Sequence, residues 1–166
     1  MSDADSELGL VTRQIGRPPR KPWRVAVRCP WGRPCVIASP PVLEDGSRFP
    51  TLFWLTCPHL IDGVGALESA GEAETWATRA EKDPALAVGL EQADRVLREQ
   101  RLREGAGSDP CADVGLAGQR DPLGVKCLHA HVALALAGIA DPVGESSIIE
   151  VGYPCDDERC ARLERA

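Results

Sequence analysis

The sequence lacks the features of several familiar protein classes. No apolar run approaches the roughly 18 residues of a membrane-spanning helix, which argues against an integral membrane protein. The acidic and polar start MSDADSELGL has neither the basic residues nor the apolar centre of a secretory signal, so we expect a cytoplasmic protein. The P-loop, the G-x-G-x-x-G loop and the H-E-x-x-H zinc motif are also missing. No nucleotide-binding or metalloprotease class is therefore indicated.

Aromatic residues are scarce throughout, and acidic residues are absent from much of the N-terminal third. The four Trp, two Phe and one Tyr are too few to favour a base-stacking surface over a place in the core. Between Gly9 and Leu43 there are seven basic residues and no acidic one. Such a segment can bind RNA or polyphosphate, here through Arg24, Arg28 and Arg33, or pair with the acidic middle of the chain. A solvated basic arm is the simpler interpretation.

The length and composition predict one domain. A chain of 166 residues with 43% hydrophobic and 27% charged residues can bury a core of ordinary size. We expect residues 1–22, which contain three prolines, to form an extended basic arm. The domain is predicted at 23–151, with a flexible excursion at 105–120, and a charged tail with two cysteines at 152–166.

Hydrophobic periodicity predicts strands first and helices afterwards. Alternating or continuous apolar residues indicate strands at 23–28, 35–39 and 52–56, the third apolar enough to be central. Helical spacing follows at 60–70, 72–82 and 83–103, the last opened by Asp83-Pro84. A further helix is expected from Asp121-Pro122 to Gly138, and residues 142–151 form a short helix or strand. The order predicts an α+β fold, a small antiparallel sheet of about three N-terminal strands covered by about four helices.

Seven cysteines are many for a chain of this length. Their odd number and the absence of an export signal argue against a disulfide framework. Metal binding, thiol reactivity and simple burial as small apolar side chains remain as explanations. No C-x2-C pair is present, so a standard zinc finger or ribbon is not indicated.

Four residues from separate parts of the chain form the predicted metal site. Cys29 and Cys57 end the first and third predicted strands, which run the same way in a meander. Cys127 and His131 are spaced i, i+4 on the predicted helix, and His129 replaces His131 if the chain is still irregular there. Three sulfurs and one imidazole suit zinc. With Cys155 as the fourth ligand, an all-cysteine set also admits an iron–sulfur cluster.

The sequence leaves several functions open. The first is a metal-stabilised cytoplasmic domain that binds an unknown protein partner. The second is a hydrolase or transferase that uses Cys127 with His129 or His131, although no oxyanion-hole or acid motif accompanies them. The third is an RNA- or polyanion-binding module.

Several stretches resemble the bacterial family called domain of unknown function 501, which is uncharacterised and mostly actinobacterial. The similarity covers roughly residues 12–144 and includes D-G-x-x-F-P-T at 45–51 and K-C-L-H at 126–129. The remaining similar stretches are Arg28-Cys29-Pro30-x-Gly32-x-Pro34-x-Val36, Leu52 to Pro58 and Leu67-Glu68-x-x-Gly71. The resemblance implies no activity. The tail with Cys155 and Cys160 lies outside it.

Overall fold

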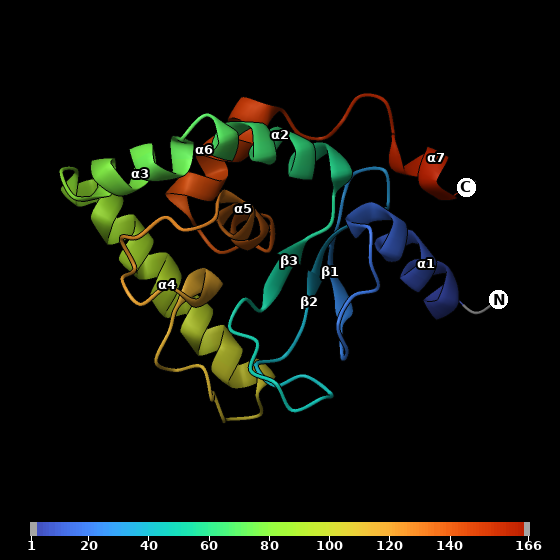
Figure 1. Ribbon diagram of the computed structural model, residues 1–166, viewed down its shortest axis with the longest axis horizontal. Helices are drawn as coiled ribbons and strands as arrows, with labels where there is room; N and C mark the ends of the chain where they lie inside the picture. Colours follow the sequence, from blue (N-terminus) through green and yellow to red (C-terminus); the bar gives the residue numbers. More distant parts are fainter. Residues whose placement is uncertain (1–2, 165–166) are drawn as a thin grey trace.

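A computed structural model describes residues 3–164 of the chain (Figure 1). The sheet has three antiparallel strands in the order β1-β2-β3: β1 (Arg24–Arg28), β2 (Pro34–Ala38) and β3 (Phe53–Leu55). The three strand predictions and the α+β class are confirmed. The prediction that the third strand is central is wrong, because β2 lies between the other two and is buried at every residue. Strand β3 is apolar because a helix covers one of its faces.

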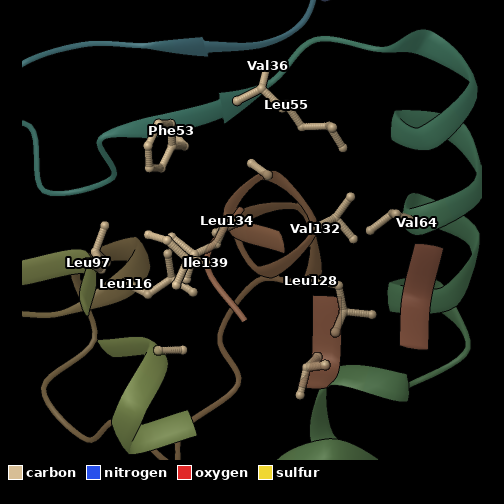
Figure 2. Packing of buried hydrophobic residues seen from close by; sticks show 14 of the residues in the cluster. Val36, Phe53, Leu55, Val64, Leu97, Leu116, Leu128, Val132, Leu134 and Ile139 are labelled. Carbon is tan, nitrogen blue, oxygen red and sulfur yellow. The ribbon is translucent and has the colours of Figure 1, made fainter. Parts of the chain in front are cut away.

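Helix α5 (Leu128–Leu136) is that covering helix, and it forms the centre of the core. Figure 2 shows Val36, Phe53 and Leu55 of the sheet directed toward α5, with Val132 of the helix beside Val64 of α2 (Pro58–Ser69) and Leu134 on the opposite side near Ile139. Helix α6 (Pro142–Val151) packs on α5 from another side, at such close range that a Cβ at Gly144 would collide with the backbone carbonyl of His131. A helix enclosed in this way must be apolar on most of its faces, which explains its run of Ala, Val and Leu.

The predicted start of this helix is wrong. Residues 121–127 form turns and extended chain, and Cys127 is the N-cap residue of α5. The Asp121 side chain accepts the backbone N–H of Leu123 at 2.9 Å, and the chain turns there, with the Gly124 N–H bonded to the Asp121 carbonyl. The helix begins only at Leu128, whose backbone N–H donates a hydrogen bond to the Glu68 carboxylate of α2.

Three helices that follow β3 and precede α5 along the chain agree closely with the predictions: α2 (Pro58–Ser69), α3 (Glu72–Ala80) and α4 (Pro84–Glu104). The Asp83 carboxylate accepts the N–H groups of Ala85 and Leu86, so Asp83-Pro84 acts as the expected N-cap and first-turn pair. Residues 142–151 are helical, which resolves the open choice there, since the Asp141 carboxylate caps α6 through the Gly144 N–H at 2.7 Å. No helix of the described chain is both long and apolar enough to cross a bilayer.

The prediction of an extended N-terminal arm is wrong for most of its length. Residues Asp3–Ile15 form helix α1, which buries Leu10 and Val11. The first proline is Pro18, so no proline interrupts the chain before Gly16. Helix α1 lies beside α7 (Cys160–Glu164), which brings the two ends of the chain together (Figure 1). The charged tail therefore packs on the domain, with Cys155 and Cys160 buried.

Residues 105–120 have no regular structure beyond the 3-10 turn η1 (Leu116–Gly118), and one buried arginine of α4 holds them. The Arg101 side chain, 0% exposed, pairs with Asp109 at 2.8 Å. It also donates to the carbonyl oxygens of Cys111 and Val114, each at 2.8 Å. The Arg101 guanidinium thus donates hydrogen bonds to backbone carbonyls of an irregular segment, which have no partners in a helix or a sheet.

We expect Arg101→Met to lower the free energy of unfolding by about 3–5 kcal/mol, because it leaves Asp109 buried without its partner. Arg95→Met on the same helix removes an exposed pair with Glu99 and should cost less than about 1 kcal/mol. Urea unfolding of both variants measures the difference. Equal effects would show that Arg101 does not anchor the segment.

Candidate metal centre

A cleft of about 620 Å³ opens between the end of α1, strand β3, and the N-terminal parts of α2 and α5. Its walls are mainly apolar and include Phe53, Trp54, Leu55, Ile61 and Ala130. The polar side chains that line it are Gln14, Arg17, Thr51, Lys126, Cys127 and His129. The cleft is thus an apolar space with a few polar groups, the usual character of a small-molecule site.

Two residues of the cleft lining, Cys127 and His129, form with Glu68 a group that can hold a metal ion. One ligand atom from each of Glu68, Cys127 and His129 lies within 4.8 Å of the other two, and no other such group of three occurs in residues 3–164. Glu68 is in the last turn of α2, Cys127 caps α5 and His129 is in its first turn. All three are half-buried. Because α5 begins later than predicted, Cys127 is paired with His129, the alternate ligand.

Hydrogen bonds fix the orientation of the His129 ring. Its Nε2 lies 3.1 Å from the carbonyl oxygen of Ile61, which can only accept, so Nε2 carries the hydrogen. Its Nδ1 lies 3.2 Å from Oε1 of Glu68. The same Oε1 accepts the backbone N–H of Leu128 at 2.7 Å, which fixes the carboxylate. In the neutral ring, Nδ1 therefore carries the free electron pair and faces the carboxylate.

Cys127 and Glu68 favour a positive charge on the His129 imidazole that lies between them. The hydrogen bond with Cys127 raises the pKa of His129 most, the Glu68 carboxylate adds to the effect, and burial opposes both, giving a pKa of about 9. Without a metal, the imidazole is therefore protonated near neutral pH. A metal cation would take the place of that proton between the same groups.

The four residues of the predicted zinc site are not brought together around one cavity. Cys29 and Cys57 line a small second cavity, whereas Cys127 lines the cleft. His131 is on α5 but is 2% exposed, and its Nδ1 lies 2.8 Å from the Asp141 carboxylate on the α6 side. This buried pair connects α5 to the cap of α6.

The second cavity collects four of the seven cysteines, Cys29, Cys57, Cys155 and Cys160. Cys155 was the predicted alternate ligand. No sequence signal indicated Cys160 in this cavity or Glu68 in the first group, because both reach their places through tertiary packing. Cys35 and Cys111 are fully buried and lie near the carbonyl oxygens of Val27 and Pro41, and burial raises the pKa of Cys35 to about 12. These two thiols have the environment of structural cysteines.

The arginines of the predicted anion site lie among internal partners. Arg24 forms an ion pair with Glu104, and Arg28 forms one with Glu7. Arg33 lines the cavity of the four cysteines. Binding of RNA or polyphosphate by these side chains remains a prediction, and it would have to compete with the carboxylates.

Comparison with known proteins gives a family and no further relative. Searches of the curated proteins and of the solved structures each found no significant match. The family model described as "Protein of unknown function (DUF501)" matches residues 25–148, about three quarters of the chain. The match includes strands β1 to β3, helices α2 to α5, and the residues Glu68, Cys127 and His129. The protein is therefore a member of the DUF501 family.

Proposed function

We propose that the protein is a zinc enzyme whose metal is bound by Cys127 and His129 of the cleft lining together with Glu68. The observation that carries the proposal is the convergence of one carboxylate oxygen, one sulfur and one imidazole nitrogen within 4.8 Å beside a cleft of about 620 Å³. Zinc accepts all three of these ligand types. A set of three protein ligands with one position left for water is typical of catalytic zinc sites, whereas structural sites use four.

The surroundings of the three residues support metal binding. The Nε2–H of His129 donates to the Ile61 carbonyl, which leaves Nδ1 directed at the site. Histidines that bind a metal usually donate their other ring N–H to a carbonyl or carboxylate in this way. The Leu128 N–H likewise orients the Glu68 carboxylate. Cys127 is the N-cap residue of α5 and so stands two residues before His129. Glu68 and His129 are thus each oriented by a backbone group that does not itself bind the metal.

The cleft supports a small substrate with an apolar body and an acidic group. The apolar walls suit an apolar ligand body, and Arg17 and Lys126 supply positive charge at the cleft. Arg17 is held in place over the Trp54 ring, 5.5 Å from its centroid. With zinc held by Glu68, Cys127 and His129, the site would supply a water molecule of lowered pKa for hydrolysis near neutral pH. We therefore place the reaction among metal-assisted hydrolyses.

Zinc content tests the metal site. We expect the purified wild type to contain about one zinc per chain that Cys127→Ala reduces below about 0.2, because a tetrahedral site loses its sulfur ligand. Cys111→Ser is the matched control, since it alters a buried thiol outside the cleft and keeps a donor for the Pro41 carbonyl. Zinc that persists in Cys127→Ala and in His129→Ala would contradict the proposal.

Cobalt substitution tests the open position. We expect the Co²⁺ protein to show a thiolate-to-metal absorption band that is absent in Cys127→Ala and that changes when azide is added. Circular dichroism of each variant checks that it is folded. A band that azide leaves unchanged would indicate a closed structural site and would contradict catalysis by the metal.

A second candidate is a metal-free thiol enzyme in which Cys127 is the nucleophile and His129 its base. The position of Cys127 at a helix N-terminus and its hydrogen bond to His129 favour this alternative. Glu68 then orients the imidazole. Alkylation of Cys127 would abolish activity of such an enzyme, and chelators would leave it unchanged.

In the metal-free protein, the pKa of His129 is expected near 9, and Cys127→Ala should lower it more than Glu68→Gln does, because the thiol is the larger cause. Nuclear magnetic resonance titration of the His129 ring measures all three proteins. A wild-type value near the ordinary 6.5 would show that no such hydrogen-bonded group forms.

A further inference from the structure

We propose that Cys29, Cys57, Cys155 and Cys160 hold an iron–sulfur cluster in the second cavity. The four cysteines come from four separate segments and line one small cavity together. Cys29 follows β1, Cys57 caps α2, Cys155 lies in the loop after α6, and Cys160 begins α7. Four cysteines are the usual ligand set of such clusters.

The thiols lie close enough to influence one another. Cys57, Cys155 and Cys160 are each no more than 6% exposed, and Cys29 is half-buried. Burial is the main reason that the pKa of Cys57 is raised to about 11, and the neighbouring thiols of Cys160 and Cys155 add to it. Burial also raises the pKa of Cys160, with Cys29 and Cys155 contributing. A bound cation would stabilise the thiolates of Cys57 and Cys160 against this cost.

Hydrogen-bond donors around the cavity point toward sulfur. The backbone N–H groups of Leu60 and His59, in the first turn of α2, reach the sulfur of Cys57. The side-chain amide of Gln14 in α1 donates to Cys160 Sγ at 3.3 Å. The indole of Trp31 donates to the Cys155 carbonyl at 2.9 Å and so holds the loop that carries this cysteine. N–H donors directed at sulfur stabilise thiolates and tune the potential of iron–sulfur clusters.

The spacing of the sulfurs favours a cluster over a single zinc ion. Zinc holds each sulfur at about 2.3 Å, which places the four sulfurs about 3.8 Å from one another. No three of these four sulfurs lie within 4.8 Å of one another in the described chain, whereas the atoms of the Glu68 group do. The cavity that the four cysteines line has a volume of about 10 Å³, about the space of one water molecule, so their side chains would move apart as a cluster binds. A cluster, in which several irons and sulfides separate the thiolates, accounts for the wider arrangement.

The experiment is anaerobic purification of the full chain, followed by absorption spectroscopy and assays of iron and acid-labile sulfide. We expect a brown protein with a broad band near 400 nm and about two to four irons per chain, with an equal amount of sulfide. Cys155→Ala and Cys160→Ala should each reduce iron at least about fivefold, because each removes one of four ligands. Cys111→Ser, outside the cavity, should retain the wild-type iron content.

The outcomes separate this inference from the proposed zinc centre. Cys127→Ala should keep its iron while losing its zinc, because Cys127 lines the other cavity. Colourless protein after anaerobic purification and reconstitution with iron and sulfide would overturn the inference. Zinc that Cys155→Ala displaces would also overturn it, in favour of a zinc site. Iron retained by both Cys155→Ala and Cys160→Ala would place the cluster elsewhere.

Discussion

The burial of helix α5 between the sheet and helix α6 is the constraint on which the rest of the structure depends. Val132 and Leu134 on opposite sides of the helix are fully buried, and Gly144 of α6 permits the close approach on another side. Since α5 is enclosed by its neighbours, its first N–H groups must find partners within the protein. Glu68 supplies one by accepting the Leu128 N–H at 2.7 Å. The same contact places a carboxylate beside Cys127 and His129, so the candidate site forms as a consequence of helix packing.

The parts of the fold that local patterns determine could be predicted from the sequence. The strands, the helices α2 to α4 and the Asp83-Pro84 cap all follow from periodicity and capping within a short window. The start of α5 could not be predicted, because Asp121-Pro122 has the same local signature as a true helix start and only the carboxylate of Glu68 decides otherwise. Helix α1 was not predicted, because the prolines that follow it favoured an extended arm over residues 1–22. Its stability comes from burying Leu10 and Val11 and from packing on α7, which no local pattern reveals.

The types of residue in the candidate site could be predicted better than which residues come together there. Cysteine and histidine in the stretch 127–131 indicated a metal or thiol centre, and Cys29 with Cys57 indicated a common sheet edge. The pairing of these two halves depended on long-range packing. The structure instead puts Glu68 beside Cys127 and places the two strand-end cysteines with Cys155 and Cys160 of the tail. Glu68 is one of many acidic residues in an acidic helical region, so its role has no signal in composition or spacing.

The two proposed centres differ in their ligands and would have different roles. The zinc centre would catalyse a reaction, and the four-cysteine centre would stabilise the fold. The mixed oxygen, nitrogen and sulfur group opens onto a cleft, whereas the four thiols are enclosed where α1, α2 and α7 meet the sheet. X-ray absorption at the zinc edge is the sharpest test of the zinc centre, because it counts the sulfur neighbours of the metal. We expect one sulfur at about 2.3 Å and nitrogen or oxygen ligands at about 2.0–2.2 Å. A shell of four sulfurs around zinc would rule out binding by Glu68, Cys127 and His129.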